Sequence, residues 1–364
     1  MTTDGPLLLR PLTLRSLTVR NRAWVAPMCQ YSAVDGVPQD WHLVHLGGLA
    51  RGGAGLVITE ATAVVPEGRI SPADTGLWSD DQVPAWRRIV DFAHGQGAAI
   101  AVQLAHAGRK ASTSVPWAGR GPVADDEGGW EPVGPGTAAY PGLRTPRSLT
   151  TDEVTDVVRA FGDAARRAVA AGFDAVEVHA AHGYLLHEFL SPLSNDRTDA
   201  YGGSYDARTR LLREVVAAVR EAVGEDRPVL VRISATDHLD GGWAVEDSVR
   251  LAALLREYGV DLVDVSSGGN APARIEVGPG YQLPLARAVR ATGVTTGAVG
   301  LITDPHQAEQ VLADGDADVV LLGREVLRDP HWPLRAAAAL GGQVRAPEQY
   351  RAAPFTPVAA RAIP

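Results

Sequence analysis

Two histidines and a tyrosine stand close together in the segment His179-Ala-Ala-His182-Gly-Tyr184, directly after an apolar run. If that run is a β-strand, His179 projects to the side opposite Val176 and Val178. Two neutral imidazoles at a strand end could donate hydrogen bonds to one carbonyl oxygen and stabilise the charge that develops there during reduction or enolisation. The tyrosine could supply a proton to a nearby carbon. A metal-ligating or a structural pair of histidines is the alternative, because His-x-x-His alone is a weak signal.

Glycine and arginine residues end two apolar runs near the C-terminus. Gly300 permits close approach of the backbone to a ligand, and Gly323 precedes Arg324, which carries a fixed positive charge. The last two strands of barrel enzymes commonly end in a phosphate site built from backbone amides and a basic group. The residues therefore predict a phosphate site. Two tight turns and a surface arginine are the alternative.

Arg232 lies inside the apolar run 229–233. Because loss of hydration is costly, a buried arginine needs an anion or several acceptors. An electron-rich cofactor ring would serve, and a buried carboxylate such as Glu177 or Asp264 is the plain alternative. Gln103, with an amide donor and a carbonyl acceptor, could hydrogen-bond to the edge of the same ring.

The chain contains a single cysteine, Cys29. One cysteine excludes an internal disulfide, a four-cysteine zinc site and an iron–sulfur cluster, and no metal is predicted. A lone cysteine is more often a small buried residue than a reactive thiol. Nucleophilic catalysis by Cys29, with a histidine from the segment 179–182 as its base, is the other possibility.

Eight short apolar runs alternate with helical patterns along the chain, and most are continuous, as in strands buried on both faces. Eight such units without a break in composition predict an α/β fold, one (β/α)8 TIM-barrel domain over residues 1–364. A doubly wound sheet is the alternative, but no G-x-G-x-x-G motif follows the first run. The runs cover residues 22–28, 55–64, 98–106, 175–182, 228–234, 262–268, 295–302 and 319–323.

The connection 107–147, between the third strand and its helix, is far longer than an ordinary loop of this type. It leaves the C-terminal face of the barrel, where barrel active sites are built, so we expect a lid or a small hairpin there. Residues 183–207 form a second long excursion on the same face. Residues 345–364 are expected to form a C-terminal tail.

Composition and charge limit the class of protein. The 364 residues include 45% hydrophobic and 21% charged side chains with a net charge of −9, which indicates a globular chain and disfavours nucleic-acid or anionic-membrane partners. We find no secretory signal and no run of about 18 apolar residues. The sequence therefore predicts a soluble, cytoplasmic protein with no membrane or nucleic-acid partner.

Several blocks, in order along nearly the whole chain, resemble the Old Yellow Enzyme family of FMN-dependent ene-reductases. The longest is Leu190-Ser-Pro-Leu-Ser-Asn-Asp-Arg-Thr-Asp-Ala-Tyr-Gly-Gly203, and the pair Cys29 and Tyr31 resembles the bacterial, thermophilic-like subgroup. The other matching blocks are residues 26–31, 59–63, 103–110, 178–184, 299–302 and 322–324.

The resemblance implies roles for individual residues. It implies tightly but non-covalently bound FMN, with Cys29 tuning the flavin potential and Arg232 facing the pyrimidine end of the ring. The other implied cofactor-binding residues are Pro27, Met28, Ala61, Gln103, Gly300, Gly323 and Arg324. The implied substrate-binding residues are His179 and His182 on the carbonyl, Tyr31, Lys110 and Arg351, with Tyr184 as proton donor.

The implied activity is reduction of enones and enals with NADPH as reductant. Flavin N5 passes hydride to the β-carbon of the alkene, while Tyr184 protonates the α-carbon. A homo-oligomer, dimer or tetramer, is also implied, with Arg351 in a neighbouring subunit's site. The segment 352–355, however, replaces the tryptophan-bearing ending usual in the subgroup.

Three other flavin proteins are the alternatives. A flavin barrel with an iron–sulfur cluster needs more cysteines than the chain has. A tRNA-dihydrouridine-synthase-like enzyme would be expected to have a basic surface. A non-catalytic flavin-binding module would have lost His179, His182 or Tyr184, and all three are present.

Overall fold

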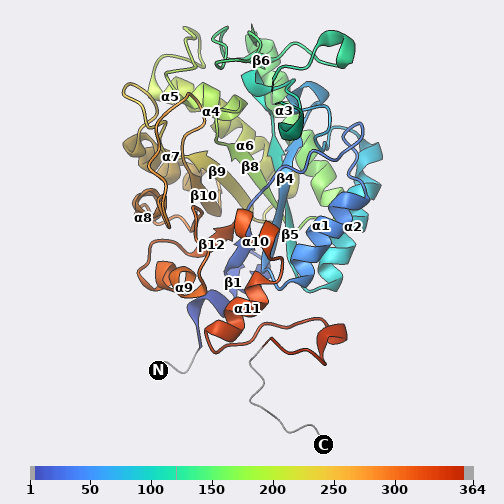
Figure 1. Cartoon of the computed structure of the whole chain (residues 1–364). Coiled ribbons are helices and arrows are strands. Elements are labelled where there is room, and N and C mark those ends of the chain that lie inside the picture. The colour runs from blue at the N-terminus through green and yellow to red at the C-terminus, as the bar shows by residue number, and fades with distance from the viewer. Residues whose placement is uncertain (1–4, 120, 356–364) are drawn as a thin grey trace, which may run out of the picture.

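The computed structural model describes residues 5–119 and 121–355, and its centre is a closed barrel of eight parallel strands (Figure 1). Each predicted apolar run contains one barrel strand, so the predicted TIM-barrel fold is confirmed. In chain order, and in order around the barrel, the strands are β3 (Ala23–Val25), β4 (Leu56–Ala63), β5 (Ala99–Ala105), β8 (Ala175–Ala180), β9 (Val229–Ser234), β10 (Leu262–Ser266), β11 (Thr296–Ala298) and β12 (Val319–Leu322).

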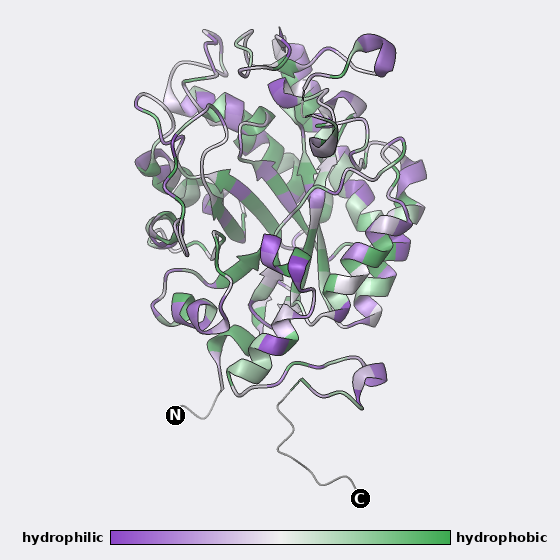
Figure 2. Ribbon diagram, viewed as in Figure 1, coloured by the Kyte–Doolittle hydropathy of each residue, from purple (hydrophilic) through white to green (hydrophobic). Residues whose placement is uncertain are grey.

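Helices surround the barrel and turn their apolar faces toward the strands (Figure 2). The longest, α3, has a capping box between Thr150 and Glu153, and Gly172 follows its last residue in the left-handed conformation. The helices are α1 (Asp40–Arg51), α2 (Val83–Gly95), α3 (Thr151–Ala171), α4 (Leu185–Leu190), α5 (Tyr205–Arg208), α6 (Arg210–Val223), α7 (Val245–Glu257), α8 (Leu283–Arg290), α9 (Pro305–Ala313), α10 (Arg324–Arg328) and α11 (Trp332–Ala339). No helix in the described part of the chain has the length and hydropathy needed to cross a bilayer.

The barrel interior is apolar at one end and polar at the other. Trp24, Ile58 and Leu230 belong to the inner apolar cluster. One alternation further along the strands, polar side chains replace them, among them Gln103 on β5 and Arg232 on β9. Because parallel strands share their direction, this polar layer lies toward the carboxyl ends, beneath the face where the long connections meet.

A short hairpin closes the amino-terminal end of the barrel and was not predicted. Its strands, β1 (Leu12–Leu14) and β2 (Leu17–Val19), pair antiparallel. Leu14 and Val19 are buried and join the inner apolar cluster. The hairpin therefore keeps water from the lower half of the barrel.

The long connection after β5 runs over the carboxyl-terminal face, as expected (Figure 1). It contains three short 3-10 helices, an antiparallel bridge between Thr113 and Pro122, and β6 (Val133–Gly134), which pairs in parallel with β7 (Arg147–Ser148). Its role as a lid stays a prediction.

The described part of the C-terminal tail lies against the C-terminal ends of α1 and α2. Residues 345–349 and the segment 94–97 line one shared cavity, and the Arg51 guanidinium lies 5.5 Å from the centre of the Tyr350 ring. These helix ends are at the amino-terminal end of the barrel. Residues 356–364 of the predicted tail lie outside the described residues.

Candidate active site

The segment that follows β8 brings the two histidines and the tyrosine together. The His179 ring lies 5.2 Å from the His182 ring and 5.0 Å from the Tyr184 ring, measured between ring centres, both nearly edge-on. His182 and Gly183 have φ angles of +60° and +70°, so the chain turns sharply there. The strand end and the tight turn thus place the His182 and Tyr184 rings next to the His179 ring.

The connection after β3 supplies the opposite wall. Cys29 and Tyr31 pack with Tyr184 against a small apolar cluster that includes Ala61 at the end of β4. The Tyr31 ring stands edge-on to Trp117 of the long connection, 5.9 Å between ring centres. The structure thus brings the predicted residues of β3, β4 and β8 into one site.

Both histidines are neutral at pH 7. Burial, reinforced by the positive charge of Arg232, holds the pKa values of His179 and His182 well below the usual range. His179 Nδ1 accepts the Ala181 N–H at 3.3 Å, so its ring proton is on Nε2. His182 Nε2 lies 2.7 Å from Ser266 Oγ. Neutral imidazoles suit the predicted role on a substrate carbonyl, and that role stays a prediction.

Tyr184 and Cys29 both keep their protons. Burial raises the pKa of the Tyr184 phenol well above its usual value. Burial, together with the acidic side chains Asp74 and Glu60, also raises the pKa of the Cys29 thiol. A neutral phenol can act as an acid. A neutral thiol is a poor nucleophile, which disfavours the alternative of cysteine catalysis.

Lys110 joins two loops of the site. Its ammonium group donates to the carbonyl oxygen of His182 at 2.8 Å and to that of Gly269, and lies 4.2 Å from the centre of the Tyr140 ring. Burial lowers the pKa of Lys110 to about 8. Lys110 therefore supports the turn that carries His182, and its predicted contact with substrate stays a prediction.

A cavity of about 150 Å³ opens at the ends of β11 and β12. Gly300 has a φ of +135°, and a Cβ there would lie 3.2 Å from side-chain atoms of Gln282 and Tyr281. Gly323 leaves open space, because a Cβ at that position would have only Met28 Sδ within 4 Å. Arginine side chains complete the lining: Arg232, Arg324 and Arg328. Close backbone approach and positive charge fit a phosphate-bearing cofactor.

Arg232 pairs with a buried carboxylate, which was one of its two expected partners, and its contact with a cofactor ring stays a prediction. Its Nε lies 3.0 Å from Asp264 Oδ2 in an ion pair, and the same side chain lines the cavity. Next to it, Gln103 Nε2 donates to Glu177 Oε1 at 2.7 Å. Burial raises the pKa values of both carboxyl groups, and the charge of Arg232 opposes this rise. An anionic ring edge could share Arg232 with Asp264.

Within this chain Arg351 lies beside the tail cavity near α11 and does not join the histidines. Its contact with a neighbouring site stays a prediction.

Across residues 5–119 and 121–355, no three His, Cys, Asp or Glu side chains cluster so that they could hold a metal ion.

Several residues that support the site were not predicted. His187 and Asp237 pair behind the turn at 182–184, and Arg109 donates to the carbonyl and side-chain oxygens of Asn270. Glu188 is fully buried and accepts the N–H of Arg109 at 2.9 Å. His187 and Glu188 stand inside the apolar run 185–190, which is the one signal that the sequence offers for them.

Glu188 predicts a specific pH dependence of stability. Burial raises its pKa to about 8, against opposing effects of Arg109 and Lys110. Between about pH 4.5 and 8 the folded chain holds a proton that the unfolded chain releases, so stability falls as pH rises, by up to about 1.4 kcal/mol per pH unit. Glu188→Gln should remove the contribution of this group, so that its slope differs measurably from that of wild type. Urea unfolding from pH 5 to 7.5 measures it, and exposed Glu257→Gln is the control, because it should keep the wild-type slope. Equal slopes for Glu188→Gln and wild type would show that Glu188 is ionised in the fold.

A closed barrel with an arginine-lined cavity at the ends of β11 and β12, and neutral polar groups at the end of β8, fits a cofactor-dependent (β/α)8-barrel enzyme. The model of the NADH:flavin oxidoreductase / NADH oxidase family matches residues 7–342. The chain belongs to this family. It is an FMN-dependent NAD(P)H oxidoreductase, which confirms the predicted enzyme class and cofactor.

Known proteins extend this result. An NADPH dehydrogenase of Geobacillus thermodenitrificans is 49% identical over 94% of this chain and 97% of its own length. Morphinone reductase in complex with tetrahydroNAD has a TM-score of 0.77 at 32% identity, covering 94% of this chain and 93% of that one. An Old Yellow Enzyme homologue from Zymomonas mobilis gives 0.75 at 29%, covering 91% and 92%. The resemblance to the Old Yellow Enzyme family is confirmed.

A larger enzyme shares the same barrel. 2-Naphthoyl-CoA reductase, in complex with 2-naphthoyl-CoA, has a TM-score of 0.83 at 26% identity. The match covers 92% of this chain and 52% of that protein. The chain therefore spans about half the length of that enzyme.

Proposed function

We propose that this flavoenzyme uses NADPH to reduce the carbon–carbon double bond of α,β-unsaturated carbonyl compounds. The observation that carries the proposal is the group of two neutral imidazoles and one neutral phenol, in which the His179 ring lies about 5 Å from the His182 ring and from the Tyr184 ring. Uncharged donors gathered at the end of one strand suit a substrate that is neutral when it binds and gains negative charge on oxygen as it reacts.

The two histidines would bind the substrate carbonyl. The fold holds both rings, His179 through the contact of its Nδ1 with the Ala181 N–H and His182 through the contact of its Nε2 with Ser266 Oγ. Hydrogen bonds to the carbonyl oxygen polarise the conjugated alkene and become stronger as charge builds on that oxygen. Tyr184 would then donate its phenolic proton to the α-carbon. Tyr31 would add a contact on the substrate side.

FMN, when bound, supplies the hydride-transfer chemistry. Its phosphate would be held by Gly300, Gly323 and Arg324, which line the cavity at β11 and β12. Arg232 would balance negative charge on the ring, and Gln103 would hydrogen-bond to its edge. The remaining ring contacts would come from Pro27, Met28, Cys29 and Ala61. The homo-oligomer and the cytoplasmic location stay predictions.

Anaerobic half-reactions test the proposal. The holoenzyme is first reduced with one equivalent of NADPH and then mixed with cyclohexenone, while flavin absorbance is followed. We expect fast reoxidation with formation of cyclohexanone. Cyclohexanone itself is the matched control, because it has the carbonyl but no conjugated alkene, and it should leave the flavin reduced. A flavin that stays reduced with both compounds would refute the proposal.

The phosphate cavity carries a prediction about FMN affinity. In Gly300→Ala the backbone must leave a φ of +135°, and restoring it for the cofactor costs about 1–2 kcal/mol. FMN should therefore bind roughly 5- to 30-fold more weakly, as measured by fluorescence titration of the apoprotein. Gly278→Ala is the control, because a Cβ there meets no atom within 4 Å. Equal losses in both variants would place the phosphate elsewhere.

A further inference from the structure

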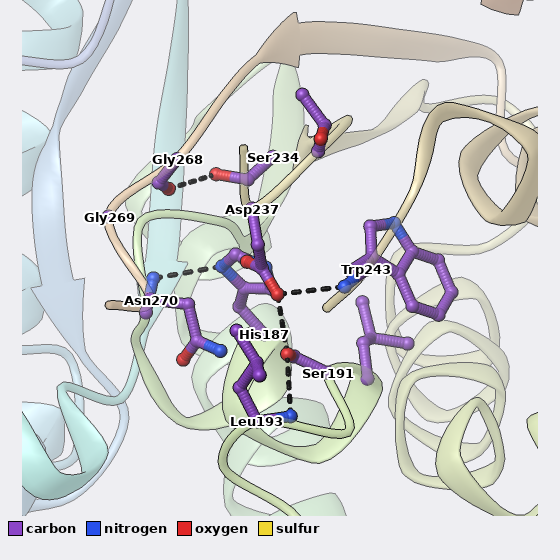
Figure 3. A network of polar contacts seen from close by, with 12 residues as sticks. His187, Ser191, Leu193, Ser234, Asp237, Trp243, Gly268, Gly269 and Asn270 are labelled. Carbon is purple, nitrogen blue, oxygen red and sulfur yellow. Dashed lines mark hydrogen bonds and ion pairs between the residues drawn. The ribbon is translucent and has the colours of Figure 1, made fainter. Parts of the chain in front are cut away.

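A buried histidine–aspartate pair lies close to Ser191 and Trp243 (Figure 3), and its histidine contacts the backbone of the turn that carries His182 and Tyr184. His187, on α4, and Asp237, after β9, have no exposed surface, and His187 Nε2 lies 3.1 Å from Asp237 Oδ1. His187 Nδ1 accepts the N–H of Gly183 at 2.9 Å. Because Nδ1 is the acceptor, the ring proton is on Nε2, the nitrogen that lies 3.1 Å from the carboxylate oxygen. Both ring nitrogens are thus engaged.

Asp237 is fixed on its other side as well. Its Oδ2 accepts the N–H of Trp243 at 2.8 Å and the hydroxyl of Ser191 at 2.5 Å. Burial pushes the pKa of Asp237 upward, but the contacts with His187, Ser191 and Trp243 outweigh burial and lower it. Asp237 is therefore ionised, and these contacts fix the orientation of its carboxylate group.

The turn cannot be held by a side chain at Gly183, because there is no room for one. A Cβ there would lie 2.3 Å from the carbonyl oxygen of Gly269, and a Cβ on Gly269 would lie 2.7 Å from His182 Cα. The two backbones pack directly on each other. The orientation of the turn consequently depends on its backbone polar groups: His182 N–H donates to Ser234 Oγ at 2.9 Å, Gly183 N–H donates to His187, and the His182 carbonyl accepts from Lys110.

We propose that His187 and Asp237 are positioning residues: they hold the Gly183 N–H and so fix the placement of His182 and Tyr184 relative to His179. The Gly183 peptide follows His182 and precedes Tyr184, so its rotation moves both neighbouring side chains. The pair transfers no proton in this role. The part of the proposal that concerns substrate rests on the proposed function above.

The variant Asp237→Asn tests the role of the ring proton. The Trp243 N–H and the Ser191 hydroxyl require an oxygen, so the new amide nitrogen must face His187. His187 Nε2 must then accept, which moves the ring proton to Nδ1, where it opposes the Gly183 N–H. We expect faster hydrogen exchange in residues 181–186 and 10- to 100-fold slower flavin reoxidation by cyclohexenone.

Two substitutions of His187 separate positioning from stability. The side-chain oxygen of His187→Asn can still accept the Gly183 N–H but cannot reach Asp237. The amide of His187→Gln reaches Asp237 but leaves the Gly183 N–H without its acceptor. Because Asn leaves a buried carboxylate unpaired, His187→Asn should have the lower thermal midpoint. Positioning predicts the opposite order for the turn: more exchange protection and faster reoxidation in His187→Asn than in His187→Gln.

Two measurements keep the test independent of turnover. Hydrogen exchange of residues 181–186, followed by mass spectrometry on the holoenzymes, reports on the turn directly. The ¹⁵N chemical shifts of ¹⁵N-histidine-labelled wild type report where the His187 proton lies. A wild-type proton on Nδ1, or exchange and reoxidation rates that simply follow the thermal midpoint, would overturn the positioning proposal. If wild type fails to reduce enones but the exchange order holds, the proposed function fails and the positioning pair stands.

Discussion

Tyr184→Phe should reduce its flavin with NADPH at the wild-type rate but pass those electrons to cyclohexenone about 10²- to 10⁴-fold more slowly. Burial keeps the Tyr184 phenol protonated, and its ring lies 5.0 Å from that of His179, so it is placed to protonate a substrate held by the histidines. General acid catalysis by a positioned side chain contributes about this factor. Phenylalanine keeps the ring and removes the proton. Stopped-flow absorbance of the two half-reactions measures the effect.

Tyr31→Phe is the matched control. Tyr31 packs in the same apolar cluster and carries the same hydroxyl group, but its proposed role is one hydrogen bond to the substrate. We expect a loss of about tenfold or less. If Tyr31→Phe loses more than Tyr184→Phe, the proton comes from Tyr31. Equal enone rates in Tyr184→Phe and wild type would remove Tyr184 from the mechanism.

The barrel could be predicted because its strands carry their own signal. A strand buried on both faces is apolar along its whole length, as in Leu262–Ser266 with its single charged residue. The terminal hairpin was missed although Leu12, Leu14, Leu17 and Val19 alternate with Thr13 and Thr18. Each strand of the hairpin has three residues with no longer apolar run around them, whereas the equally short β3 and β11 lie inside the runs 22–28 and 295–302. The length of the apolar run around each strand therefore decided whether the strand could be predicted.

The site was predictable where one segment or one strand end holds the chemistry. His179, His182 and Tyr184 lie within six positions, and Gly323 precedes Arg324. For Arg232 the sequence allowed two partners, because the edge of a cofactor ring and the carboxylate of Asp264 could each satisfy a buried guanidinium group. In the structure Arg232 pairs with Asp264 and also lines the cavity at the ends of β11 and β12.

The supporting contacts could not be predicted, since they depend on how separate loops meet. His187 contacts Asp237 across 50 positions of sequence, and Lys110 reaches the carbonyl oxygens of His182 and Gly269 from the long connection. Neither separation follows a helical or strand period. Such contacts follow from the closed barrel, which brings the ends of β5, β8, β9 and β10 to one face.

Removal of one carbonyl-binding histidine should have the second large effect. His179→Ala takes away a donor whose proton is fixed on Nε2 by the Ala181 N–H. Loss of one preorganised donor to a developing oxyanion typically costs about 10²- to 10³-fold in rate. We expect this loss in the rate at which cyclohexenone reoxidises the reduced enzyme. Half-maximal reoxidation should also require a higher cyclohexenone concentration.

His179→Gln separates the hydrogen bond from the loss of volume. The glutamine amide N–H can reach the position of the imidazole Nε2, while the contact of Nδ1 with the Ala181 N–H is lost. Because a donor is restored without the fixed geometry, His179→Gln should be about tenfold faster than His179→Ala and still slower than wild type. Thermal midpoints of both variants check the fold. If glutamine is no faster than alanine at equal stability, His179 acts by packing, and the carbonyl is bound by other groups.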